Sequence, residues 1–201
     1  FPCPEFPLWV STGAPGMTVD ADMTQEMTVT VVMEHSYMGD LTIELTCPDG
    51  NVLSLHEMGG GGTHLGEPVD IDASPFEPGT GYEYSWSPNA TNSTWAAESF
   101  NVGTLPPGTY AATGDWADLE GCPVNGEWTL TFCDYWGADN GFLFGWGIQF
   151  TDDQEFGFDD IQNPAPDWDC AVSGWAGNPA AENCQEWAFP EGISADTSFV
   201  F

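Results

Sequence analysis

Hydrophobic and polar residues alternate in two well-separated stretches of the chain. In the first, bounded by Gly39 and Gly50, every second residue from Leu41 to Leu45 is aliphatic and the residues between them are polar. In the second, from Asn125 to Asp134, the apolar positions are taken by Trp128, Leu130 and Phe132. A period of two is typical of half-buried strands. Because Gly, Pro, Asn and Asp bound both stretches, the pattern predicts an all-β sandwich.

Further strands are predicted at residues 27–33, 51–55, 82–86 and 108–112, with regular strands continuing to Phe150. Pro48-Asp49-Gly50 has the composition of a tight connection between the strands at 41–46 and 51–55. The segment from 58 to 101 contains four consecutive glycines and several prolines, so we expect a long loop region there, ordered by function or by bound ions.

The two alternating stretches also carry a family resemblance. Residues 35–50 read H-x-Y-x-G-D-L-x-I-x-L-x-x-P-x-G, and residues 125–150 contain N-G-x-W-x-L followed by an aromatic, Gly-rich strand. This ordered pattern resembles the P domains that follow the catalytic domain of furin- and kexin-like convertases. The resemblance extends over about residues 27–150 and implies a β-sandwich of jelly-roll type.

A closer version of the pattern is found in large secreted surface proteins of gliding bacteria that use type IX secretion. The elements that carry it here, in order, are residues 60–63, 66–68, 78–82, 90–92 and 121–126. This resemblance implies a surface adhesin rather than a convertase.

The composition divides the chain into three parts. Residues 1–26 begin with three closely spaced prolines and are predicted to form an extended arm that pairs at a sheet edge. Residues 27–150 form the P-domain-like sandwich. Residues 151–201, with paired acids and two cysteines, are predicted to be a C-terminal extension or the start of a second β module.

The chain of 201 residues has 32 Asp and Glu but no Lys or Arg, which gives a net charge of −32. Its carboxylates therefore have no Lys or Arg partner and must be solvated, hydrogen-bonded or neutralised by metal ions. Binding to nucleic acid is excluded because it requires Lys or Arg at the phosphates. Insertion into a membrane is not expected, since no stretch is apolar and long enough.

The six cysteines form an even set without a C-x-x-C pair, which favours disulfides over zinc. Proximity in the sequence favours Cys122 with Cys133 and Cys170 with Cys184. Cys3 and Cys47 are then left for each other. The sequence allows 15 pairings and does not settle among them.

Calcium is the predicted cofactor. It binds six to eight oxygen atoms from carboxylates, carbonyls and water, and Gly-rich loops expose carbonyls. One predicted group follows the glycine run and another brackets the turn after the strand at 125–134. The candidate ligands are Glu67, Asp70, Asp72, Asp134 and Asp139. Neither group has the EF-hand spacing, so a solvated acidic surface is the alternative.

No catalytic residue is predicted, because no nucleophile motif accompanies the three histidines and His35 is expected to be a structural residue of the resemblance motif. Trp86 and Trp136 are candidates for stacking on a sugar, with core packing as the alternative.

The sequence therefore predicts a non-catalytic, secreted or cell-surface module that is adhesive or builds filaments. Its expected partners are other copies or neighbouring β modules of the same surface protein, and glycans. The alternatives are an accessory P domain of a secreted subtilisin-like protease and a carbohydrate-binding module.

Overall fold

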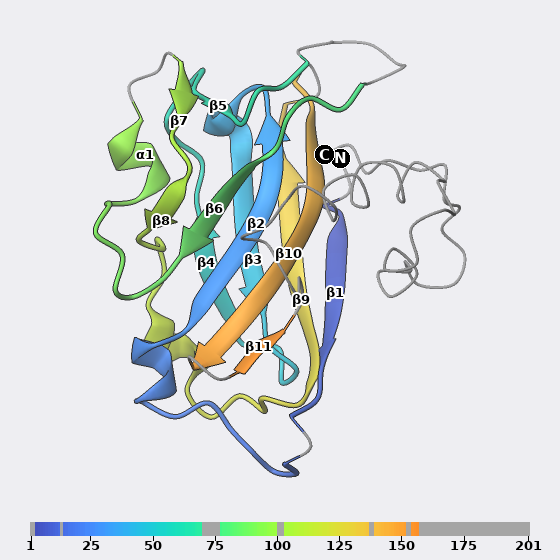
Figure 1. Ribbon diagram of the computed structural model, residues 1–201, viewed down its shortest axis with the longest axis vertical. Helices are drawn as coiled ribbons and strands as arrows, with labels where there is room; N and C mark the ends of the chain where they lie inside the picture. Colours follow the sequence, from blue (N-terminus) through green and yellow to red (C-terminus); the bar gives the residue numbers. More distant parts are fainter. Residues whose placement is uncertain are drawn as a thin grey trace.

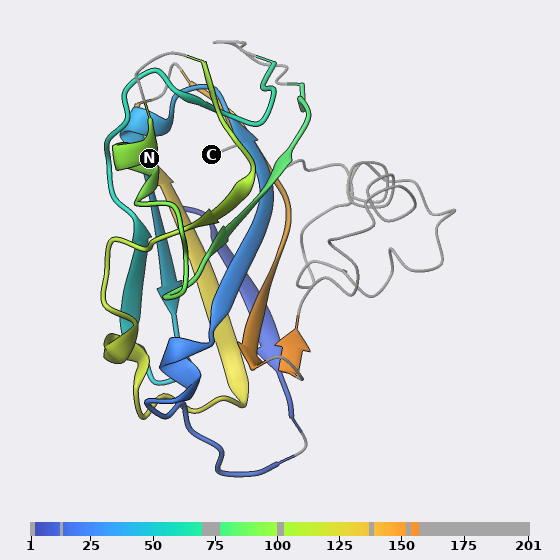
Figure 2. The same ribbon diagram turned by 60° about the vertical axis from the view of Figure 1, so that its left-hand side comes forward.

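The computed structural model describes residues 3–12, 14–69, 77–99, 103–136, 139–151 and 154–156 (Figure 1). These residues form two β-sheets, so the predicted all-β sandwich is confirmed. The strands of both sheets run along the long axis of the molecule (Figure 2). The predicted division into three parts stays a prediction, and residues 157–201 lie outside the described part.

The four-stranded sheet has the order β1-β9-β3-β4 and is antiparallel throughout. Its strands are β1 (Glu5–Val10), β9 (Gly126–Asp134), β3 (Leu41–Thr46) and β4 (Val52–His56). The two stretches that alternate most regularly in the sequence are thus β3 and β9, and they lie side by side with Ile43 opposite Phe132.

The other sheet contains seven strands. Its main path is β11-β10-β2-β5-β7, and β6 joins β2 to β8. The bounds are β2 (Thr28–His35), β5 (His64–Leu65), β6 (Tyr82–Trp86), β7 (Thr104–Leu105), β8 (Gly108–Tyr110), β10 (Gly141–Thr151) and β11 (Gln154–Phe156). Most pairs are antiparallel, but β5 with β7 and β6 with β8 are parallel.

The core lies between the sheets and is built by the alternation seen in the sequence. Leu41, Ile43 and Leu45 of β3 are fully buried on one face, while Glu44 on the other face is exposed. Across the interface, Trp128 of β9 meets Phe150 of β10 with ring centroids 5.2 Å apart. Burial of these large apolar side chains is the main source of stability.

The N-terminal segment pairs at a sheet edge, as predicted. Strand β1 lies beside β9, with Phe6 opposite Leu130. Phe6 is buried and packs edge-on against Phe132, with ring centroids 5.5 Å apart, whereas Pro7 faces solvent. A proline is tolerated here because an edge strand needs to donate hydrogen bonds on one side only.

Both described disulfides differ from the pairs predicted by proximity. The structure joins Cys3 to Cys133 and Cys47 to Cys122, with Cα–Cα distances of 4.5 and 6.2 Å. The physical reason is the extended strand β9, which separates Cys122, just before its first residue, from Cys133, near its last. Antiparallel neighbours β1 and β3 then bring Cys3 to one end and Cys47 to the other. Cys170 and Cys184 lie outside the described residues.

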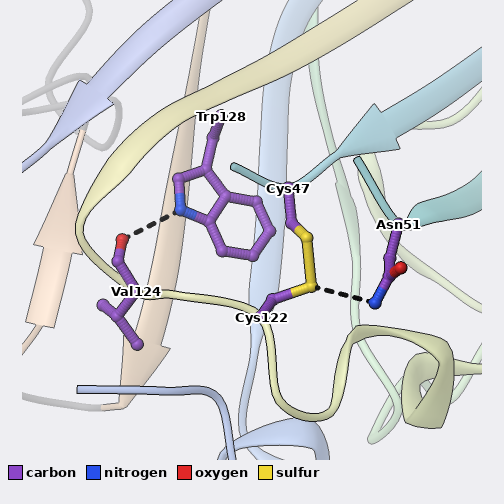
Figure 3. The surroundings of a disulfide bond; sticks show 5 residues. All are labelled: Cys47, Asn51, Cys122, Val124 and Trp128. Atoms are coloured by element: carbon purple, nitrogen blue, oxygen red, sulfur yellow. Dashed lines mark hydrogen bonds between the residues drawn. A yellow bond between two sulfur atoms is a disulfide. The ribbon is translucent and has the colours of Figure 1, made fainter. Parts of the chain in front are cut away.

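The disulfide between Cys47 and Cys122 lies at the end of the core (Figure 3). Asn51 Nδ2 approaches Cys122 Sγ at 3.5 Å, and the indole of Trp128 donates to Val124 O at 2.9 Å. The disulfide and the Asn51 contact hold the segment before β9 to the turn between β3 and β4, and the Trp128 bond holds that segment to the start of β9.

Short helical turns connect the strands. They are η1 (Met23–Gln25), η2 (Met38–Asp40), η3 (Trp116–Leu119) and α1 (Trp95–Glu98). Helix α1 lies near β7 and β8 on one side of the sandwich (Figure 1). The region from 58 to 101, expected to be mainly loop, thus contains β5, β6 and α1.

The glycine run permits close packing between η2 and α1. Gly60 has φ +89°, and a Cβ there would lie 2.0 Å from Met38 Cε and 2.7 Å from Ser99 Oγ. Gly59 also lies against Ala96 of α1. Packing therefore accounts for glycine at these positions without a bound ion.

Candidate functional site

The two tryptophans predicted to stack on a ligand lie in opposite environments. Trp86 of β6 has no exposed surface, and its ring centroid lies 4.6 Å from that of the buried Trp95. The stacking prediction for Trp86 is therefore wrong, because its ring faces the core. Trp136 follows β9 and is 64% exposed, and its role stays a prediction.

Of the first predicted calcium group, only Glu67 is described. Its Oε1 atom accepts a hydrogen bond from the hydroxyl of Tyr82 at 2.9 Å. Asp70 and Asp72 lie outside the described residues, so the structure does not test the group.

The second predicted calcium group contains Asp134 and Asp139. Asp134 Oδ1 accepts from the backbone N–H of Trp136 at 2.9 Å, and its Oδ2 atom faces His35. These partners are hydrogen-bond donors, which satisfy a carboxylate without a metal. Within the described ranges, no group of three or more His, Cys, Asp and Glu side chains is arranged to hold a metal ion. Calcium stays a prediction.

His35 forms the centre of a polar cluster at the end of β2. The backbone N–H of Tyr37 donates to His35 Nδ1 at 3.1 Å, which places the imidazole proton on Nε2. His35 Nε2 lies 3.5 Å from Asp134 Oδ2, and the imidazole is fully buried. Burial raises the pKa of the nearby Asp40 carboxyl, and the Asp134 charge raises it further, while His35 acts in the opposite direction.

His56, at the end of β4, is a second buried histidine. Burial lowers its pKa to about 4, although its contact with the carbonyl of Met38 opposes that change. Nε2 lies 3.3 Å from Met38 O, so it carries the proton of a neutral ring, and Nδ1 has no hydrogen-bond partner among the described residues. The ring packs against Trp95, with centroids 5.1 Å apart.

Glu34 is a buried carboxyl group next to His35 in sequence, but it lies on the opposite face of β2. Burial raises its pKa to about 8, while a hydrogen bond from the backbone N–H of Gly79 lowers it. That bond is 3.3 Å long and reaches Oε1, and Oε2 has no hydrogen-bond partner in the part of the chain that the structure describes. Burial therefore favours the neutral carboxyl, and the chain has no Lys or Arg to stabilise its charge.

The buried position of these groups limits their chemistry. His35, His56 and Glu34 each have no exposed surface, so none can touch a substrate in solvent. Their contacts join strand ends and fix loops. The described contacts of these three side chains are thus structural, and Glu34 makes its contact from the face of β2 opposite His35.

An open pocket of about 430 Å³ lies at the side of the seven-stranded sheet. Helix α1 contributes Glu98, the segment around β7 contributes Thr104 and Pro106, and β8 contributes Tyr110. Thr63, which precedes β5, completes one wall. This pocket exposes a carboxylate, hydroxyl groups and proline surface together.

The sequence reasoning missed Glu34, His56 and the pocket around Glu98. An acid directly after the apolar run Val31-Val32-Met33 in β2 was a signal for a buried carboxyl. By contrast, the pocket is formed by segments that β-sheet pairing brings together, and its residues share no sequence motif.

Comparison with protein families gives a match to the proprotein convertase P-domain over residues 24–70. The matched segment runs from η1 through β2, β3, β4 and β5. This supports a P-domain-like module in the first part of the sandwich. The finer resemblance to type IX surface proteins is not tested by this match.

Among curated proteins, leupeptin-inactivating enzyme 1 of Streptomyces exfoliatus is 38% identical over 60 residues. The match covers 29% of this chain, and the chain spans 13% of that enzyme. Among solved structures, the complex of an Aeromonas sobria serine protease with its chaperone matches 80% of this chain and 24% of that chain. The identity is 14% and the TM-score 0.27, too low to support an argument about fold or function.

Proposed function

We propose that this chain provides a non-catalytic, P-domain-like module of a larger extracellular protein, and that the module stabilises or positions an enzymatic neighbour. The observation that carries the proposal is the P-domain match on β2 to β5, which contribute strands to both sheets of a disulfide-linked sandwich. Disulfides are typical of oxidising compartments outside the cytosol. No helix in the described part of the chain is long and apolar enough to cross a membrane.

The similarity to leupeptin-inactivating enzyme 1 favours an accessory role. That protein is an enzyme, and the shared segment is a small part of it. Since His35 and His56 are buried here, the proposed module supplies a rigid surface and leaves the chemistry to its neighbour.

The test compares the complete parent protein with a variant that lacks this module. We expect deletion to lower the yield or melting temperature of the neighbouring domain, and we expect the purified module to hydrolyse no peptide substrate. Turnover by the module, or a neighbour that is unchanged by the deletion, would contradict the proposal.

The adhesive or filament-building role is the second proposal. Strand β1 lies at the end of its sheet, and its Trp9 is 72% exposed. An open strand edge with an exposed aromatic ring suits contact with another module. Electron microscopy of the native protein distinguishes the proposals: filaments or arrays favour adhesion, and single particles with an enzymatic domain favour the accessory role.

A further inference from the structure

The pocket beside α1 holds an ionisable side chain whose hydrogen-bonding capacity is only partly used. Glu98 is half-buried, and its Oε1 atom accepts from the backbone N–H of Ser93 at 2.9 Å. Its Oε2 atom makes no hydrogen bond with any described residue. The carboxylate is also close enough to Tyr110 to raise the pKa of that phenol, in addition to the larger effect of burial.

Three hydroxyl groups around Glu98 already donate hydrogen bonds to backbone carbonyls. Thr63 Oγ1 donates to Gly60 O at 2.8 Å, and Ser99 Oγ donates to Ala96 O at 2.9 Å. Tyr110 donates its phenolic proton to Pro106 O at 2.6 Å. A hydroxyl that donates its single proton retains lone pairs, so these three groups can only accept from a ligand, and Ser99 is the most accessible of them because Thr63 and Tyr110 are almost fully buried.

The rest of the wall adds few donors. Pro106 and Pro107 have no backbone N–H, and Asn92 directs a side-chain N–H to the carbonyl of Thr109 at 2.9 Å. The pocket therefore offers a carboxylate and mainly acceptor oxygens beside the exposed apolar surface of Pro106 and Pro107.

This arrangement selects a cation that carries several N–H donors and an apolar stem. Residues 1–201 contain no Lys or Arg, so such a group must come from outside them. A planar guanidinium presents five donors and binds carboxylates well, and its methylene stem packs on apolar surface. A metal ion fits less well, because the described residues include no group of three or more metal-ligating side chains.

We propose that the pocket formed by Glu98, Thr63, Ser99, Leu105, Pro106 and Tyr110 binds an arginine side chain of a partner protein, with the guanidinium at Glu98. The net charge of −32 draws basic partners toward the module, and the pocket adds a specific contact. This inference does not depend on the accessory or adhesive role proposed above.

The experiment is a nuclear magnetic resonance titration of the full, isotope-labelled chain with N-acetyl-arginine amide. We expect saturable shifts at Glu98, Thr104 and Tyr110. The neutral citrulline analogue has nearly the same shape without the charge, and it should leave these resonances unchanged. Equal binding of both probes, or shifts that avoid the pocket, would overturn the proposal.

A pair of matched variants separates the pocket from general attraction to an acidic protein. Glu98→Gln keeps an oxygen that can accept from Ser93, and it should weaken binding at least about tenfold, the loss typical of an ionic hydrogen bond. Glu120→Gln removes the same charge at the exposed end of η3, outside the pocket, and should leave binding unchanged. Equal weakening by both variants would refute a specific site.

One further variant and two competitor titrations complete the test. Thr104→Lys places an ammonium group at the exposed rim and should abolish binding, which provides a second variant if Glu98→Gln does not fold. Spermidine and calcium chloride are titrated in parallel. If either displaces the arginine probe at equal concentration, the pocket takes small cations in general and the assignment to arginine fails.

Discussion

His35 Nε2 lies 3.5 Å from Asp134 Oδ2, and this contact joins the end of β2 in one sheet to the end of β9 in the other. The imidazole is held from the opposite side by the backbone N–H of Tyr37, which donates to Nδ1. The neighbouring backbone also comes close, since a Cβ on Gly141 would lie 2.4 Å from His35 Cδ2. The motif histidine is therefore a connector between the sheets.

Loss of the Asp134 charge should weaken this connection. Asp134→Asn retains an oxygen for the N–H of Trp136, but it removes the charged acceptor that faces His35. We expect unfolding in urea to show a loss of about 1–2 kcal/mol. Asp118→Asn, an exposed position in η3, is the control and should change stability by less than about 0.5 kcal/mol. Equal effects of the two variants would contradict the role given to Asp134.

Glu34 should make the module less stable as the pH rises. Its pKa is about 8 in the folded protein against an ordinary value of 4.5, so the folded state retains a proton that the unfolded state loses between these values. The free energy of unfolding therefore falls through this window and levels off above it. The displacement of the pKa corresponds to on the order of 5 kcal/mol.

Glu34→Gln tests this dependence, because glutamine resembles the protonated acid and can still accept from Gly79. We expect wild type and variant to have similar stability at pH 5, and the variant to be more stable by several kcal/mol at pH 9. Glu44→Gln, on the exposed face of β3, should leave the difference between the two pH values unchanged. His56 titrates in both proteins and cancels in the comparison. Parallel pH profiles for wild type and Glu34→Gln would show that Glu34 ionises freely in the fold.

The strand pattern could be predicted from the sequence because alternation is a local property. The segments at 41–46 and 82–86 are β3 and β6 with the predicted bounds, and Tyr84 and Trp86 alternate with more polar residues there. Partners across the fold are set by register, which the local pattern does not contain. For this reason the prediction from proximity wrongly paired Cys122, which precedes β9, with Cys133, which lies near the end of that strand.

The candidate site was less predictable for a related reason. Burial of a tryptophan depends on which face of a strand meets the other sheet, so Trp86 and Trp136 could not be told apart by type alone. The donor and acceptor character of the pocket at Glu98 depends on which hydroxyl groups already donate their protons within the fold. That information exists only once Thr63, Ser99 and Tyr110 have their backbone partners.

The disulfide pairing can be checked directly. Trypsin has no site in this chain, so the unreduced protein should be digested with a protease that cleaves after Glu. Cleavage after Glu127 separates Cys122 from Cys133, and mass spectrometry should then find Cys47 linked to Cys122 and Cys3 linked to Cys133.

The two bridges should differ in what they stabilise. The double variant Cys47→Ser/Cys122→Ser opens a link across 75 residues in the core and should cost about 2–4 kcal/mol of global stability. The variant Cys3→Ser/Cys133→Ser should mainly speed hydrogen exchange in β1, because this strand pairs only with β9 among the described strands. Unchanged exchange in β1 would contradict this division of roles.

Gly60 and Gly50 form a matched pair that separates backbone strain from crowding. Their φ values are +89° and +87°, so alanine costs similar backbone energy at both positions, about 1 kcal/mol. A Cβ at Gly50 meets nothing within 4 Å, whereas a Cβ at Gly60 meets Met38 and Ser99. Gly60→Ala should therefore destabilise the module by about 1–3 kcal/mol more than Gly50→Ala in urea unfolding. Shortening Met38 in Gly60→Ala/Met38→Ala should recover part of that excess, and additive losses in the double variant would show that the two side chains do not compete for space.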